Sequence, residues 1–196
     1  MFDLVYPADP APVFPRPSMT RPGPALRAAG EMLPLVETSG QVYGQASREA
    51  CHDGSHLPHP VVHLHIIDRE GRIYLQKRSL AKQLYPGLWD TAVGGHVTYG
   101  ETALEALYRE AAEELGLQAF FPVLLETYSF ENQEESELVF VYAIVGHPAL
   151  DPDNAEVSEG RWWTLEELEA AFGKGLLTPM FESEFPRFRQ RLLSLL

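Results

Sequence analysis

The sequence predicts an α+β fold, in which a mixed β-sheet carries helices packed on its faces. Residues 61–68 alternate Val62, Leu64 and Ile66 with the residues between them, and this period of two is typical of a strand. Residues 102–115 instead carry apolar side chains at helical spacing, which predicts a helix with one buried stripe. Because strands and helices of this kind alternate along a chain of 196 residues, we expect a single domain with a sizeable core.

Composition restricts the partners and the compartment. The formal net charge is −13, so the chain on average repels nucleic acid and anionic membranes, and we expect neither as a partner. A small phosphorylated substrate needs a metal ion and local cations to bind such a chain. The single cysteine, Cys51, forms no internal disulfide, and the N-terminus has no basic segment followed by an apolar one. Both features are typical of a cytoplasmic protein.

The first 30 residues differ from the rest, because seven of them are proline: Pro7, Pro10, Pro12, Pro15, Pro17, Pro22 and Pro24. Proline lacks an N–H donor and fixes φ, which disfavours both a helix and a central strand. We therefore interpret residues 1–30 as an extended proline-rich arm that packs on its own domain or on a second subunit of a homodimer. A disordered tail is the equal alternative. Residues 31–196 form the folded domain.

The strands of this domain are predicted from short apolar runs bounded by turn residues. In chain order they cover residues 33–36, 42–45, 61–68, 73–76, 121–128, 138–145 and 159–163. The first two form a hairpin around Ser39 and Gly40, and residues 47–59 form a short helix or loop that leads into the third strand. A turn at residues 85–87 precedes the segment 89–93, which leads into a glycine loop.

Helices are predicted where capping residues meet a helical pattern. Gly116 is the natural C-terminal cap of the helix at residues 102–115. Thr164 and Glu167 have the spacing of a capping box, which opens a helix that runs to about Phe172. A final helix is predicted over residues 186–196.

Three carboxylates project from neighbouring faces of the helix at residues 102–115: Glu110, Glu113 and Glu114. Like charges this close repel one another, and only Arg109 and a bound cation offset them locally. Carboxylate oxygens on a rigid element suit Mg²⁺ or Mn²⁺, which in turn bind phosphate oxygens. The alternative is a solvated acidic face, which explains the charges but not Gly95, Gly116 and Arg109 at their positions.

This stretch resembles the signature of the Nudix hydrolases, whose fixed positions are filled by Gly95, Glu101, Arg109, Glu110, Ala111, Glu113, Glu114, Gly116 and Leu117. Only Ala111 departs, because a bulky aliphatic residue is usual there. The resemblance implies an α/β/α sandwich with a mixed sheet and a hydrolase that cleaves a diphosphate linkage in a nucleoside diphosphate joined to a second moiety. It further implies that Glu113, Glu114 and the Gly95 carbonyl bind Mg²⁺ or Mn²⁺. Glu110 is then a ligand or the general base, and Arg109 orients the glutamates.

A second set of residues is similar to the branch of this superfamily that contains type I isopentenyl-diphosphate isomerase. That enzyme holds a metal ion with three histidines and two glutamates, and the matching positions here are His52, His59, His96, Glu135 and Glu137. Imidazole and carboxylate ligands suit Zn²⁺ or Mn²⁺, so the resemblance implies a second divalent ion. The alternative, a cluster that only makes hydrogen bonds, stays equally open. We interpret His63 and His65 as ordinary face residues of a strand.

The resemblance also assigns Arg78 and Lys82 to the substrate diphosphate, since guanidinium and ammonium groups suit phosphate oxygens. Two solvated loop cations are the alternative. Gly94 stands where the isomerase has its catalytic cysteine, and a glycine cannot protonate a double bond. We therefore predict a hydrolase, with an isomerase-like or isoprenoid-diphosphate enzyme and a non-catalytic ligand-binding module as alternatives.

Overall fold

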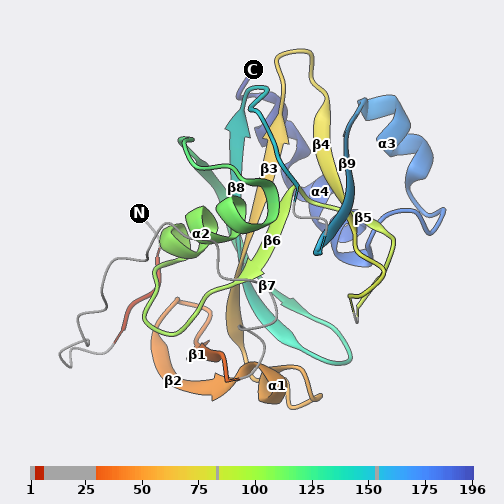
Figure 1. The fold of residues 1–196 in the computed structure, drawn as a ribbon. Coiled ribbons are helices and arrows are strands. Elements are labelled where there is room, and N and C mark those ends of the chain that lie inside the picture. The colour runs from red at the N-terminus through yellow and green to blue at the C-terminus, as the bar shows by residue number, and fades with distance from the viewer. Residues whose placement is uncertain (1–2, 7–29, 83, 153–154) are drawn as a thin grey trace. The chain divides into compact units, whose positions relative to one another are not determined.

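The computed structural model describes residues 3–6, 30–82, 84–152 and 155–196 (Figure 1). The chain falls into two compact units, each of which is described by itself. The smaller unit consists of Met1–Val61, His96–Ala106 and Tyr128–Val139, and the larger of Val62–Gly95, Leu107–Thr127 and Phe140–Leu196. Residues 7–29 of the predicted arm lie outside the described residues.

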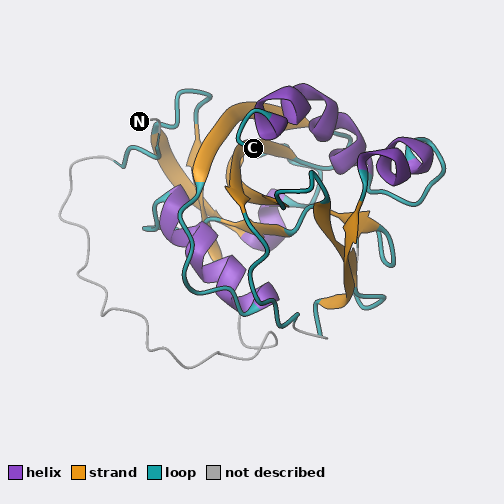
Figure 2. Cartoon of the chain, turned by 90° about the horizontal axis from the view of Figure 1, so that it is seen from above, coloured by secondary structure: helices purple, strands orange, loops and turns teal. Residues whose placement is uncertain are grey.

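Nine strands and four helices are assigned within the described residues (Figure 2). The strands are β1 (Met32–Val36), β2 (Val42–Ser47), β3 (His59–Ile67), β4 (Ile73–Arg78), β5 (Trp89–Asp90), β6 (Val93–His96), β7 (Val123–Glu131), β8 (Ser136–Val145) and β9 (Val157–Trp163). The helices are α1 (Arg48–Cys51), α2 (Ala103–Leu115), α3 (Leu165–Ala171) and α4 (Pro179–Leu193). The main sheet has the order β5-β4-β3-β8-β7, with β6 paired to β3 and β9 to β4. The predicted α+β class with a mixed sheet is confirmed.

In the smaller unit, β1 and β2 pair in an antiparallel hairpin. The described N-terminal residues 3–6 attach to the loop that opens α2. The hydroxyl of Tyr6 donates to the Glu101 carbonyl at 2.8 Å and accepts from the Gly100 N–H at 3.0 Å. A carboxylate oxygen of Asp3 accepts from the Ala103 N–H at 3.1 Å, which satisfies one of the free donors at the start of the helix. Burial raises the pKa of Tyr6 to about 12.

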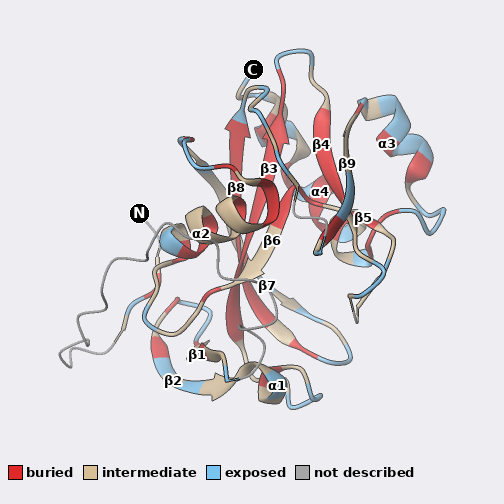
Figure 3. Ribbon diagram, in the orientation of Figure 1, coloured by how far each residue is buried: buried red, intermediate tan, exposed pale blue. Residues whose placement is uncertain are grey.

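In the larger unit, α2 and α4 lie on opposite faces of the sheet (Figure 1). Side chains on a strand alternate between its faces, and Ile66 of β3 pairs with Tyr74 of β4, so even-numbered residues of both strands share one face. Gln76 of β4 contacts Glu114 of α2, while odd-numbered residues of β3 contact Glu184 of α4. Strand β3 is buried along its whole length (Figure 3). The largest fully buried side chains of this unit include Phe140, Phe181, Phe188, Leu64, Ile66 and Leu75.

Helix α3 opens with the predicted capping box, which is confirmed. The predicted start of the last helix is wrong, because α4 begins at Pro179 and not at residue 186. Thr178 is the N-cap, and Pro179 occupies the first helical position, where a backbone N–H would have no partner within the helix. Pro186 lies inside the helix, whose buried phenylalanines hold it together there. Within the described residues, no helix combines the length and apolar character needed to cross a membrane.

A buried carboxylate ties α4 to β3. The two oxygens of Glu184 accept hydrogen bonds from His63 Nδ1 at 2.7 Å and from His65 Nε2 at 2.9 Å. All three side chains are buried, so His63 and His65 lie on a face of β3 that packs against α4. Burial alone raises the pKa of Glu184, but the charges and hydrogen bonds of the two histidines outweigh it and hold this pKa well below its usual range.

This shift predicts how stability depends on pH. A carboxylate whose pKa is lowered by folding contributes stability above its unfolded pKa, about 4.3 for glutamate, and that stability is lost as the pH falls through the folded pKa. We expect Glu184→Gln to lower the free energy of unfolding by about 1.5–3 kcal/mol at pH 7, because a hydrogen bond to a buried charge is lost. Urea unfolding of both proteins should show a constant difference from pH 7 to pH 5 that shrinks below about pH 4.3. A difference that grows on acidification would contradict this account.

Candidate functional site

The larger unit contains the glycine loop and the acidic part of α2. A Cβ atom at Gly95 would clash with the side chain of Glu110 as it lies here, so the glycine allows the loop to approach the carboxylate this closely. Arg109 Nη1 lies 2.6 Å from Glu110 and 3.6 Å from Glu113, the second in the i,i+4 geometry that the sequence predicts. The arginine thus holds two of the carboxylates in place beside the loop.

Glu114 is the most buried of the three carboxylates. Its Oε2 accepts hydrogen bonds from Gln76 Nε2 at 3.0 Å and from the Gly94 N–H at 3.2 Å. Burial raises its pKa to about 8, the charge of Glu110 adds to the rise, and Lys82 opposes it. A buried carboxylate beside another carboxylate is stable in its charged form only with a cation close by. The donor set of carboxylate oxygens therefore fits a hard divalent ion.

The predicted phosphate-binding cations lie near these carboxylates. Arg78 lies on the same face of β4 as Gln76, and Gln76 contacts Glu114. Across the strand pair, Gln76 lies opposite Asp90 of β5. Arg78 donates from Nε to the Leu84 carbonyl at 3.0 Å and from Nη1 to Asp90 at 3.3 Å. Lys82 Nζ lies 2.6 Å from Glu156. Both cations therefore pair with carboxylates.

The smaller unit brings together the five residues of the second predicted set. His52 follows α1, His59 begins β3, His96 ends β6, and Glu135 and Glu137 stand at the start of β8. Ligand atoms of His52, His59 and His96 lie within 4.8 Å of one another, and so do those of His59, Glu135 and Glu137. His52 Nε2 is 3.1 Å from His96 Nε2 and 3.3 Å from Glu135 Oε2. Four separate stretches of sequence thus converge on one group.

Backbone carbonyls fix the tautomers of two of these histidines. Nδ1 of His52 lies 2.7 Å from the Arg48 carbonyl, and Nδ1 of His59 lies 2.9 Å from the Leu57 carbonyl. Since a carbonyl only accepts, Nδ1 is the protonated nitrogen of each neutral ring, and Nε2 carries the lone pair. Burial lowers the pKa of His59 to about 4, and its Nε2 has no hydrogen-bond partner among the described residues. A buried neutral imidazole with a lone pair facing other ligand atoms fits a metal ion.

Two residues of this carboxylate site did not emerge from the sequence. The sequence places Gln76 only in a strand, although this residue precedes Arg78 by two positions and so shares its face. Asp90 contacts Arg78 because β4 and β5 pair, and no local sequence pattern predicts this pairing. The spacing of two residues between Gln76 and Arg78 is the one sequence signal that indicates a role for Gln76.

Comparisons with known proteins identify relatives of this chain. Residues 57–181 match the family model described as the NUDIX domain. Isopentenyl-diphosphate Delta-isomerase of Brevibacterium linens is 32% identical over 147 residues, which are 72% of this chain and 81% of that protein. YfcD of Escherichia coli, described as an uncharacterized Nudix hydrolase, is 32% identical over 143 residues, which are 73% of this chain and 79% of that protein.

Solved structures show the same fold. The crystal structure of DR0079 from Deinococcus radiodurans matches 80% of this chain and 98% of its own, with a TM-score of 0.70 and 28% sequence identity. The MutT protein of Methanosarcina mazei Go1 matches 68% of this chain and 94% of its own, with a TM-score of 0.58 and 26% identity.

Proposed function

The chain belongs to the Nudix family, and on this premise we propose that it is a hydrolase that cleaves a diphosphate linkage in a nucleoside diphosphate joined to a second moiety. One observation carries the proposal: Glu110, Glu113 and the buried Glu114 lie together on α2, and Gly95 packs against the first of them. Without a cation this arrangement is unfavourable, as the raised pKa of Glu114 indicates.

Glu113, Glu114 and the carbonyl of Gly95 hold a divalent ion in this proposal, and Glu110 is a further ligand or the general base. The ion, Mg²⁺ or Mn²⁺, supplies positive charge for the phosphate oxygens and activates water. The protein provides position: Arg109 pairs with two glutamates, while Gln76 and the Gly94 N–H orient Glu114. Catalysis then rests mainly on positioning and charge neutralisation.

An assay of the products tests the proposal, because cleavage of the linkage gives a nucleoside monophosphate and the phosphorylated second moiety, which chromatography separates. The purified protein is incubated with nucleoside diphosphates, nucleoside diphosphate sugars and dinucleoside polyphosphates, with Mg²⁺, with Mn²⁺ and with EDTA. We expect hydrolysis of at least one diphosphate compound that stops in EDTA and returns with added metal. Absence of hydrolysis across the panel at saturating Mg²⁺ would favour a non-catalytic binding module instead.

Arg78 and Lys82 are expected to bind the substrate diphosphate. Arg78→Ala and Lys82→Ala should therefore raise KM more than they lower kcat, with a loss of about 1.5–3 kcal/mol in kcat/KM for each charge-assisted contact. Lys77→Ala is the matched control, because Lys77 is the neighbouring cation on β4 but points to the opposite face and pairs with Glu159. An unchanged KM in both test variants, measured with the best substrate of the panel, would remove this role.

The histidine cluster favours a second candidate function, an isoprenoid-diphosphate enzyme in which a second divalent ion positions the substrate. The convergence of His52, His59 and His96 with two glutamates supports it. Gly94 supplies no proton donor, so we expect no isomerisation of isopentenyl diphosphate. Incubation with that compound and product analysis test this expectation, since rapid isomerisation would require a proton donor other than Gly94 and would favour an isomerase over both candidates.

A further inference from the structure

Helix α4, on the face of the sheet opposite to α2, reaches the predicted phosphate-binding arginine through its N-cap. The buried hydroxyl of Thr178 accepts from the Phe181 N–H at 3.2 Å and donates to Asp90 Oδ1 at 2.9 Å. The backbone around it is also fixed, because Trp89 N–H donates to the Leu176 carbonyl and Thr178 N–H to the Trp89 carbonyl, each at 2.9 Å. The start of α4 is thus held directly against β5.

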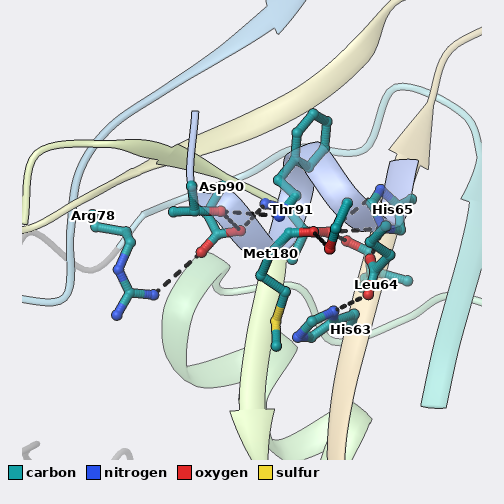
Figure 4. Close-up of polar contacts among 11 residues, drawn as sticks. His63, Leu64, His65, Arg78, Asp90, Thr91 and Met180 are labelled. Atoms are coloured by element: carbon teal, nitrogen blue, oxygen red, sulfur yellow. Dashed lines mark hydrogen bonds and ion pairs between the residues drawn. The ribbon is translucent and has the colours of Figure 1, made fainter. Parts of the chain in front are cut away.

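Asp90 carries this link to Arg78. Its Oδ1 accepts from both the Thr178 hydroxyl and the Thr91 N–H, at 2.9 Å each, and this fixes the plane of the carboxylate. Its Oδ2 then accepts from Arg78 Nη1 at 3.3 Å (Figure 4). With Nε bound to the Leu84 carbonyl, the guanidinium is held at two points.

The second turn of α4 anchors the helix to the sheet. Glu184 binds His63 and His65. The Thr91 hydroxyl donates to the Leu64 carbonyl at 2.8 Å and lies at the edge of the His65 ring (Figure 4). Thr91 therefore contacts both Asp90, through its N–H, and His65, which Glu184 binds. Two independent polar anchors, six residues apart on α4, fix the helix relative to the carboxylate that meets Arg78.

We propose that Asp90 and Thr178 are positioning residues, which act through Arg78 to set its guanidinium for a substrate diphosphate. The proposal rests on the role that the proposed function gives to Arg78. Arginine loses several rotatable bonds when it binds phosphate, and a guanidinium already fixed in place loses less freedom on binding. The hydroxyl of Thr178 matters because it binds Oδ1 of Asp90, and the carboxylate is then oriented with Oδ2 toward Arg78.

The test measures binding rather than turnover, with inorganic pyrophosphate and Mg²⁺ as the probe in isothermal titration calorimetry. Thr178→Val keeps the shape of the side chain but removes the hydroxyl, and Asp90→Asn removes the charge that meets Arg78. Each is expected to weaken binding on the order of threefold to tenfold. In an Arg78→Ala background neither change should weaken binding further, because residues that act through one group are not additive.

Two controls separate positioning from a loss of stability. Thr178→Ser retains the hydroxyl and both of its hydrogen bonds, so its Kd should equal that of the wild type. Phe185→Leu lowers the stability of the same helix through its contacts with Phe181 and Phe188, and its Kd should not change. Thermal unfolding confirms that the variants are folded at the temperature of the titration.

The outcomes are distinct. If Arg78→Ala itself binds pyrophosphate as tightly as the wild type, the substrate role of Arg78 in the proposed function fails. If Arg78→Ala weakens binding but Thr178→Val and Asp90→Asn leave Kd unchanged, only the positioning role of Asp90 and Thr178 fails. The same conclusion follows if either change weakens binding in the Arg78→Ala background as much as it does in the wild type. Tighter binding by Asp90→Asn also overturns it, because Asp90 would then compete with the phosphate.

Discussion

Glu114→Gln is expected to reduce hydrolysis on the order of 10³-fold or more while the protein keeps its fold, and Glu113→Gln is expected to do the same. Glutamine preserves the shape but removes the charge that holds a divalent ion, and the loss of one preorganised electrostatic contact already costs about 10²- to 10³-fold in kcat. Folding raises the pKa of Glu114, so a neutral side chain there should leave the metal-free protein at least as stable at pH 7. Turnover at saturating Mg²⁺ and thermal unfolding in EDTA measure the two effects.

Glu105→Gln is the matched control on the same helix. Its exposed carboxylate accepts from the N–H and the hydroxyl of Thr102 at 2.9 Å each, and a glutamine oxygen accepts equally well. We expect its activity to remain within about twofold of the wild type, as for surface changes away from the site. Activity within a few-fold of the wild type in Glu114→Gln, at saturating Mg²⁺, would show that Glu114 holds no catalytic ion.

The signature helix could be read from the sequence because everything that defines it is local. Its buried stripe, its C-terminal glycine and its three carboxylates lie within one short stretch, and helical spacing alone makes the carboxylates neighbours. The capping box of α3 is local in the same sense. Features of this kind depend on residues three or four apart, which is the range over which a sequence pattern constrains geometry.

Contacts across the sheet could not be read in this way. Glu184 lies 119 and 121 residues from the histidines it binds, so its role depends on where α4 crosses β3. The predicted start of α4 was seven residues too late, and this placed the N-cap Thr178 outside any helix. Asp90 similarly meets Arg78 only because β4 and β5 pair in one particular register. Nothing near Asp90 in the sequence specifies that register.

The histidine cluster shows a third case, in which distant residues were grouped by resemblance rather than by any local rule. No periodicity joins His52, His59 and His96, yet they come within reach of a common point in the smaller unit. What the resemblance did not provide is the tautomer of each ring. That follows from the carbonyls of Arg48 and Leu57, which the fold places beside Nδ1.

His59→Ala is expected to weaken the binding of Mn²⁺ or Zn²⁺ to this cluster by more than about 100-fold. Even the loss of a group that only orients a ligand costs about 10- to 100-fold in metal affinity, and His59 offers a lone pair directly. Burial keeps its ring neutral, because its pKa falls to about 4, so a metal ion does not compete with a proton at pH 7. Isothermal titration of metal-stripped protein with each ion, and the metal content after dialysis, measure the effect.

His56→Asn is the matched control, because His56 lies in the same loop, is half-exposed and pairs with Glu131 instead of the cluster. Asparagine also tolerates the positive φ of 53° at this position, where alanine is strained. The control should bind metal as the wild type does. A wild-type protein that takes up neither ion at the cluster, or equal affinity in wild type and His59→Ala, would mean that the histidines only bond to one another. The 3.1 Å contact of His52 with His96 would then be an ordinary hydrogen bond, with the proton on His96 Nε2.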